Sequence, residues 1–142
     1  MKRVRDVLQV KGSEVFTIEP DASVYDAIKI MADQSIGALV VLQGEHLVGL
    51  ISETDYARKI VLQGRTSANT RVREIMTDRV LYVSPDQDIS ECMALMTEKR
   101  FRHLPVMDND QLAGLISIGD LVKSIIDEQL FTIEQLERYI SG

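Results

Sequence analysis

The sequence predicts an α+β protein built from two copies of one β-α-β-β-α unit, and three observations support this fold class. Residues 15–61 align without gaps on residues 80–126, and Pro20-Asp21 recurs 65 positions later as Pro85-Asp86. Each copy has the apolar spacing of a helix after its Pro-Asp pair. Two β-rich runs separated by a turn then follow in each copy. Neither unit is expected to be stable alone, because a segment as short as one unit buries too little apolar surface.

The first strand and the first helix of each unit flank the Pro-Asp pair. The strand is expected at residues 14–18 and 80–83. A capping-box-like pattern, Ser23-x-x-Asp26 or Asp88-x-x-Glu91, marks the start of the helix. The apolar positions 24, 27, 28 and 31 match 89, 92, 93 and 96, which is the i, i+3, i+4, i+7 spacing of one buried face.

Two further strands and a second helix complete the unit. In the first copy the strands are expected at residues 38–42 and 46–52, separated by a turn at residues 43–45. Asp108-Asn109-Asp110 forms the matching turn in the second copy. The second helix is expected to start near Asp55 or Asp120, and Gly64 is expected to end the first of these.

The repeat divides the chain into four segments. The first unit takes residues 1–64, a polar linker residues 65–71, the second unit residues 72–127, and a tail residues 128–142. In the tail, Thr132-x-x-Gln135 predicts the start of a short helix over residues 133–140. Its apolar residues Ile133, Leu136 and Ile140 are expected to pack on the body or on a partner.

Composition and charge exclude several classes of function. A net charge of −6 and a pI of about 4.9 argue against a nucleic-acid surface, which needs a basic stripe. No apolar run approaches the roughly 18 residues of a membrane span, and no leader pattern is present, so a cytoplasmic location is expected. The single cysteine, Cys92, excludes an internal disulfide; it aligns with Ala27, so we interpret it as a small core residue.

The segments most alike between the copies are Gly49-Leu-Ile-Ser-Glu-Thr-Asp55 and Gly114-Leu-Ile-Ser-Ile-Gly-Asp120. Each is a strand that ends in a hydroxyl, turns, and enters a helix with a carboxylate in its first turn. The helix start favours a nearby anion, and the carboxylate can accept hydrogen bonds from a vicinal diol. Helix capping alone explains the same residue types, and their recurrence does not decide between the two interpretations.

The order of these motifs resembles the CBS domain. Pro-Asp, a helix, Arg102-His-Leu-Pro-Val106 and Gly-Leu-Ile-Ser-x-x-Asp follow one another, and the resemblance covers residues 4–126. Thr54-Asp-Tyr-Ala-Arg58 and the Phe131-Thr-Ile-Glu-Gln135 tail further resemble small stand-alone CBS pairs, or Bateman modules, of bacteria and plants.

The resemblance implies two repeats packed with pseudo-two-fold symmetry, assembly into a disc-like homodimer, and two clefts for adenosine ligands. AMP, ADP, ATP, NAD(H) or S-adenosylmethionine are the ligands that it implies. The ribose-binding Asp of the family falls on Asp55 and Asp120, and its hydroxyl positions fall on Ser52, Thr54, Ser117 and Gly119. The implied adenine contacts are Phe16, Ile36, Gly37 and Ala38 for the Asp120 cleft, and Leu81, Phe101, Thr77 and Met76 for the Asp55 cleft.

The two clefts are not expected to be equivalent. Gly119 lacks the hydroxyl of Thr54, and Gly37-Ala38 stands where the other copy has Arg102-His103. Arg102 and His103 could therefore hold phosphate in one cleft, and Thr54 with Arg58 or Lys59 in the other. One site can be weak or empty.

The expected function is a non-catalytic regulatory module that acts as an energy or redox-state sensor without a catalytic cofactor. No Ser-His-Asp set, metal-ligand cluster or Walker-type loop is visible in the sequence. One alternative is a dimeric interaction scaffold whose nucleotide sites are vestigial. Another is an enzyme that acts on a nucleotide.

Overall fold

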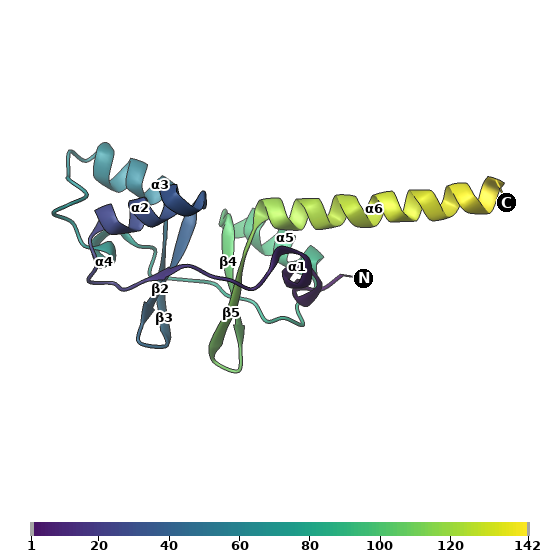
Figure 1. Cartoon of the computed structure of the whole chain (residues 1–142), viewed down its shortest axis with the longest axis horizontal. Helices are drawn as coiled ribbons and strands as arrows, with labels where there is room; N and C mark the ends of the chain where they lie inside the picture. The colour runs from purple at the N-terminus through teal and green to yellow at the C-terminus, as the bar shows by residue number, and fades with distance from the viewer. Residues whose placement is uncertain (1, 142) are drawn as a thin grey trace.

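The computed structural model describes residues 2–141 and forms two α+β units side by side, with one long helix extending away from them (Figure 1). The first half contains α1 (Val4–Lys11), β1 (Thr17–Ile18), α2 (Val24–Gln34), β2 (Ala38–Gln43), β3 (His46–Ser52), α3 (Glu53–Tyr56) and the π-helical turn η1 (Ala57–Val61). The second half contains α4 (Val72–Ile75), α5 (Ile89–Lys99), β4 (His103–Asp108), β5 (Gln111–Ser117) and α6 (Ile118–Ser141). The predicted α+β class is confirmed.

The two β-hairpins confirm the repeat in their register. Ala38 lies opposite Ser52 in the β2–β3 pair, and His103 lies opposite Ser117 in the β4–β5 pair. The register shifts between Val41 and Leu42 in the first hairpin, and at the same place, between Val106 and Met107, in the second. The copies therefore share an irregularity as well as a pattern.

The first strand of each unit is shorter than expected. Only Thr17 and Ile18 of residues 14–18 form a strand, which pairs in parallel with β2. The strand expected at 80–83 is reduced to one bridge between Val83 and Val106. Pro105 explains the difference: it takes the place of Val40, whose N–H donates to the Phe16 carbonyl, and proline has no N–H to give.

The short helices α1 and α4 are exchanged between the two units. Val72 and Ile75 of α4 are buried in the core of the first unit, against residues such as Val24 and Met31. Val4 and Val7 of α1 are buried in the core of the second unit. The two cores therefore do not follow the order of the repeats along the chain, and neither unit is complete without a helix from the other.

The recurring Pro-Asp pair is the docking site for the exchanged helix. At α4, the Arg73 N–H donates to the Pro20 carbonyl over 2.9 Å and its side chain pairs with Asp21 over 2.7 Å. At α1, the Arg5 N–H donates to the Pro85 carbonyl over 3.0 Å and its guanidinium pairs with Asp86.

The predicted helix starts are confirmed, although only one uses the expected bond. Ser23 Oγ accepts a hydrogen bond from the Asp26 N–H over 3.1 Å. Asp88 also caps its helix, but it accepts from the Ser90 N–H rather than forming a box with Glu91. The Cys92 thiol is fully buried on α5, and burial raises its pKa to about 11, which confirms a core residue that stays protonated at neutral pH.

A C-terminal helix is present, but it does not begin near Thr132. Residues 118–141 form one continuous helix, α6, which joins the second helix of the unit to the tail. Thr132 is an interior residue whose hydroxyl donates to the Glu128 carbonyl over 3.1 Å. No glycine or proline occurs between Asp120 and Ser141, so nothing in the sequence interrupts the helix.

Candidate functional site

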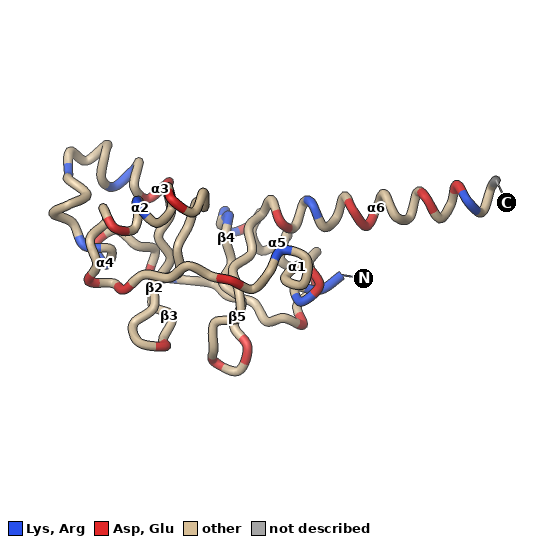
Figure 2. Tube along the Cα trace, viewed as in Figure 1, with Lys and Arg blue, Asp and Glu red and all other residues tan. Residues whose placement is uncertain are grey.

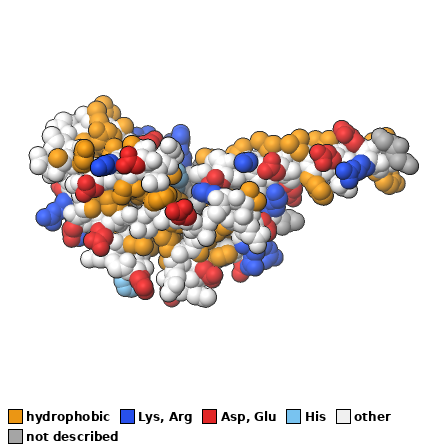
Figure 3. Space-filling model, viewed as in Figure 1, with side chains coloured by type: hydrophobic (Ala, Val, Ile, Leu, Met, Phe, Trp, Pro, Cys, Tyr) orange, Lys and Arg blue, Asp and Glu red, His pale blue; other side chains and the backbone are white. Residues whose placement is uncertain are grey.

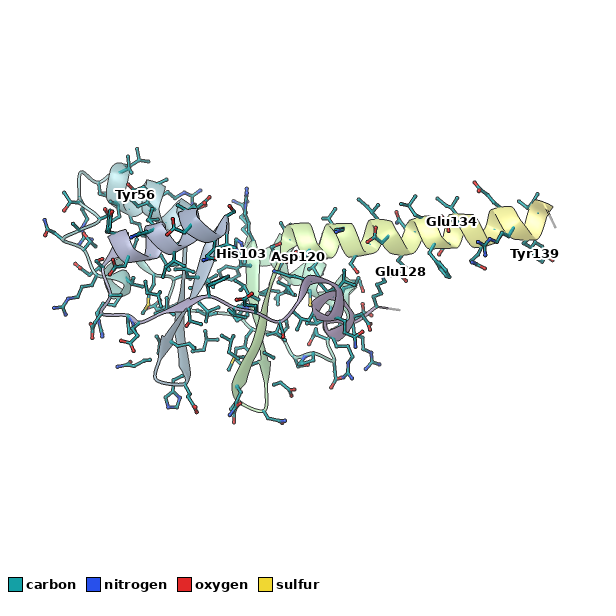
Figure 4. All side chains as sticks on the ribbon, viewed as in Figure 1. Tyr56, His103, Asp120, Glu128, Glu134 and Tyr139 are labelled. Atoms are coloured by element: carbon teal, nitrogen blue, oxygen red, sulfur yellow. The ribbon has the colours of Figure 1, made fainter. Side chains whose placement is uncertain are left out.

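A cavity of about 330 Å³ lies between the two units, beside the start of α6. Its volume falls in the range of roughly 300–1,000 Å³ found for small-molecule sites. It is lined from both repeats, by Lys11, Glu14, Val15, Phe16, Ser35, Ile36, Gly37, Ala38, His103, Leu115, Ser117 and Asp120. Figure 4 shows His103 and Asp120 close together where β4 approaches the first turn of α6.

This cavity gathers most of the residues predicted for the Asp120 cleft. The apolar and small residues Phe16, Ile36, Gly37 and Ala38 line it together with His103, Ser117 and Asp120. A larger cavity of about 540 Å³ lies between the hairpin turns, but its lining contains none of the predicted site residues. The smaller cavity is therefore the candidate site.

Ser117 and Asp120 form a reciprocal cap at the start of α6. Ser117 Oγ accepts from the Asp120 N–H over 3.1 Å, and Asp120 Oδ2 accepts from the Ser117 N–H over 2.8 Å. The capping interpretation of this motif is thus correct. It does not exhaust the carboxylate, which has about four lone-pair positions and lines the cavity at the same time.

Lys11 is a cavity residue that the sequence analysis missed. Its Nζ donates to Asp120 Oδ2 over 2.6 Å and to the Leu115 carbonyl over 2.5 Å. Burial alone would raise the pKa of Asp120, but the hydrogen bonds from Lys11 and Ser117 and the charge of Lys11 outweigh it and hold the pKa below its ordinary value. Lys11 comes from the exchanged helix α1. The start of that helix, Val4-Arg5-Asp6, resembles the start of α4, Val72-Arg73-Glu74, and only this similarity could have suggested the exchange.

His103 reaches across the boundary between the repeats. A Cβ built at Gly37 would lie 3.9 Å from His103 Nε2, an ordinary van der Waals distance, so the imidazole lies next to Gly37 of the first repeat. Burial and the nearby charges of Lys11 and Arg102 lower the pKa of His103, and Asp120 opposes this shift only in part. The ring is therefore neutral near pH 7, and it can both donate and accept a hydrogen bond.

Ser52 and Asp55 form the equivalent cap at the start of α3. The Ser52 N–H donates to Asp55 Oδ2 over 2.9 Å, and the Asp55 N–H donates to Ser52 Oγ over 3.3 Å. Asp55 Oδ1 also pairs with Lys59 over 3.3 Å, and Lys59 donates to the Ile75 carbonyl. This carboxylate thus has a lysine partner too, supplied by the π-helical turn η1 that follows α3.

The structure does not bring the remaining predicted residues into the 330 Å³ cavity. Thr54 and Arg58 are exposed, Thr77 pairs through its backbone with Leu50, and Leu81 packs against the second core. The residues concerned are Ser52, Thr54, Asp55, Arg58, Lys59, Met76, Thr77, Leu81 and Phe101, which were predicted for the Asp55 cleft or its phosphate, together with Arg102 and Gly119. The exposed Arg102 contributes its carbonyl, which accepts from the first N–H of α6 over 2.9 Å.

Comparison with known proteins identifies the repeat. The family model of the CBS domain matches residues 4–62 and 72–127. The chain belongs to the CBS-domain family. The two sequence repeats are its two CBS domains, and the cavity lies between them.

Stand-alone CBS proteins are among the relatives. The chain is 39% identical to the mitochondrial CBS domain-containing protein CBSX3 of Arabidopsis thaliana, over 98% of this chain and 72% of that protein. A CBS-domain protein of Burkholderia ambifaria, described as a putative signal-transduction protein, has a similar structure with a TM-score of 0.86 and 54% identity, over 90% of this chain and 96% of that one. A CBS-domain protein of Agrobacterium tumefaciens has a TM-score of 0.82 and 37% identity, over 87% and 98% of the two chains.

Two features of residues 2–141 bear on other functions. In this part of the chain no helix is long and apolar enough to cross a membrane. No group of three or more His, Cys, Asp or Glu side chains suited to a metal ion occurs among the same residues.

Proposed function

We propose that this CBS pair is a non-catalytic regulatory module that binds an adenosine nucleotide (AMP, ADP, ATP or NAD(H)) in the Asp120 cleft. The observation that carries the proposal is the convergence of two repeats on one cavity. Phe16, Ile36 and Ala38 offer apolar surface for a base, and Asp120 offers a carboxylate for a ribose diol. A cytoplasmic location and a homodimeric state belong to the same proposal.

Lys11 and His103 give the cleft its proposed selectivity for phosphate-bearing ligands. Without a ligand, Lys11 neutralises Asp120 over 2.6 Å. A ribose diol would take over the carboxylate and release the ammonium group, which then faces the phosphate. Because the lysine enters on α1 and α1 packs in the second core, this exchange links the ligand to the packing of the two repeats. Such a difference between bound and free arrangements is what a sensor needs.

A direct test is calorimetric titration of the purified protein with AMP, ADP, ATP, NADH and adenosine. We expect saturable binding of at least one phosphate-bearing ligand, and unchanged ligand when it is recovered by chromatography after a long incubation. Conversion of the ligand would favour the enzyme alternative. Absence of binding by every ligand would leave the scaffold alternative in its place.

Replacing Lys11 by glutamine is expected to separate phosphate binding from nucleoside binding. AMP affinity should fall about tenfold, because a charge-assisted hydrogen bond contributes about 1.5–3 kcal/mol. Adenosine affinity should stay the same or rise, because no ammonium group then competes for Asp120. Titration of both ligands into both proteins measures the difference. Lys29→Gln is the control: this lysine is exposed on α2 and lies outside the cavity lining, so the same change of charge should alter neither affinity much. Equal losses for AMP and adenosine in the Lys11 variant would contradict this role.

A further inference from the structure

The outer half of α6 carries an apolar face that the protein's own body does not cover. Every residue from Gln129 to Ile140 is exposed, and α6 extends well beyond the two CBS domains (Figures 1 and 3). Ile133 is 50% exposed, Leu136 58% and Ile140 83%. Hydrophobic side chains run along one edge of the helix in the space-filling view. About three turns of helix without tertiary contacts are marginal in water, so a covering surface would stabilise them.

A heptad pattern runs along the exposed part of α6. Five of its exposed apolar residues follow this pattern, whereas Leu130, Phe131 and Tyr139 lie outside it. Val122, Ile126, Gln129, Ile133, Leu136 and Ile140 are spaced by 4, 3, 4, 3 and 4 residues, and we call these six the α6 seam. This spacing places them on one face of the helix, as in the a and d positions of a coiled coil. Isoleucine occupies all three a positions of the seam, and valine, glutamine and leucine occupy the d positions. β-Branched residues at a with leucine at d favour two parallel strands.

We infer that the α6 seam binds the α6 seam of a second copy of this chain, as a parallel, in-register, two-stranded coiled coil. This inference is independent of the proposed nucleotide binding, and it names a surface for self-association. It also differs from the disc-like packing that the family resemblance implies, because the contact runs along the tail.

Gln129 is the residue that favours the parallel, in-register arrangement. In that arrangement it faces its own equivalent, and the two amides can donate to and accept from one another. In the antiparallel arrangement that pairs Val122 with Ile140, Gln129 would face Ile133 and lose that partner. A single polar residue in a coiled-coil seam commonly specifies register in this way, at some cost in stability.

The residues beside the seam are compatible with a second copy and disfavour anionic partners. In the parallel pair, Ile125 faces Leu130 of the other copy and Thr132 faces Glu137, so no like charges meet. Acidic residues recur along α6 (Figure 2). The heptad spacing places Asp127, Glu128 and Glu134 on the outer face, away from the seam, where they would repel nucleic acid or an anionic membrane. The two CBS domains of the same chain do not cover the seam either. Helix α6 contains no glycine or proline after Gly119 at which it could fold back onto them.

The first experiment compares two substitutions by light scattering at micromolar concentration. Ile133→Glu puts a charge into the seam, whereas Phe131→Glu puts the same charge on the opposite side of the helix, where the phenylalanine is 62% exposed. Both remove one exposed apolar residue and neither touches the core, so both proteins should fold. We expect wild type and Phe131→Glu to be dimers, and Ile133→Glu to dissociate at least a hundredfold more readily. A monomeric wild type, or a dimer that Ile133→Glu does not weaken, would overturn the inference.

The second experiment tests register and orientation with single cysteines, since the native Cys92 is buried and inert. Leu136→Cys should form an intermolecular disulfide rapidly under mild oxidation, because facing d positions approach within disulfide distance. Glu134→Cys, on the outer face, should not. If Val122→Cys and Ile140→Cys chains crosslink only when mixed, the helices are antiparallel and the inferred register is wrong.

Discussion

Asp120→Asn is expected to weaken AMP binding by about tenfold to a hundredfold and to leave the melting temperature of the ligand-free protein almost unchanged. Asparagine keeps an oxygen that can accept from the Ser117 N–H, so the cap of α6 survives. The pair with Lys11 is lost, but the two side chains are 34% and 25% exposed, and such pairs contribute only about 0–1 kcal/mol. The negative charge proposed to face the ribose is also lost.

Asp55→Asn is the matched control, because Asp55 forms the same type of cap and lies outside the cavity lining. It should keep wild-type AMP affinity and the full rise in melting temperature on adding AMP, whereas Asp120→Asn should lose most of that rise. Equal loss of binding in both variants would show that the ligand occupies both clefts. If both single variants and the double variant bound AMP with wild-type affinity, the assignment of these carboxylates to the binding site would be wrong.

The stability of Asp120→Asn should also depend on pH differently from that of the wild type. Because the pKa of Asp120 is held below its ordinary value of 3.8, its interactions stabilise the folded protein above that pH and lose this effect as the pH falls through the folded-state pKa. Wild type should therefore lose more stability than Asp120→Asn between neutral pH and pH values near the carboxyl range. Thermal melts of the two ligand-free proteins over that range would measure the difference.

Val7→Asp is expected to unfold the second CBS domain, whereas Val10→Asp should be tolerated. Both residues lie on α1 and differ by one helical turn, but Val7 is 5% exposed and Val10 is 79% exposed. Val7 packs in the core of the second domain, so the substitution leaves an unpaired charge in apolar surroundings. An uncompensated buried charge costs about 3–5 kcal/mol, a large fraction of the stability of a small protein.

Chemical denaturation with backbone amide exchange distinguishes this result from a local effect. Loss of protection should appear first at α5, β4 and β5, which lie far from residue 7 in sequence. If instead Val7→Asp disturbed only the first domain, or if the two variants were equally stable, the packing of α1 in the second domain would be wrong.

The fold was predictable where local patterns and the repeat agreed. Ser23, the two hairpins and the helix starts at Asp55 and Asp120 depend on residues close in sequence, and all were predicted. The reduction of the strand expected at residues 80–83 to a single bridge at Val83 was not predicted. It depends on whether residue 105, on another strand, has an N–H group. The length of α6 was not predicted. The pattern at Thr132 indicated a new helix start, but α6 already runs through this residue and its hydroxyl bonds within the helix.

The candidate site was predictable to the extent that the repeat placed its parts. Phe16 and Asp120 lie in different copies, and only the pseudo-symmetry implied by the family resemblance brought them together. Lys11 escaped because its role depends on the exchange of α1, a contact between residues 109 positions apart with no local signature. The Pro-Asp pair was recognised as a repeat marker, but its docking role at Arg73 and Arg5 required the three-dimensional contacts.

The exchanged helices impose an order on the growing chain. During synthesis from the N-terminus, the first core becomes complete only when α4 emerges, after all the strands that it covers. Helix α1 is made well before its partners, since Ile116 and Leu121 of its core come more than a hundred residues later. Until then its apolar face has no permanent partner. This early helix therefore closes the second core only after β5 and the start of α6 have been made.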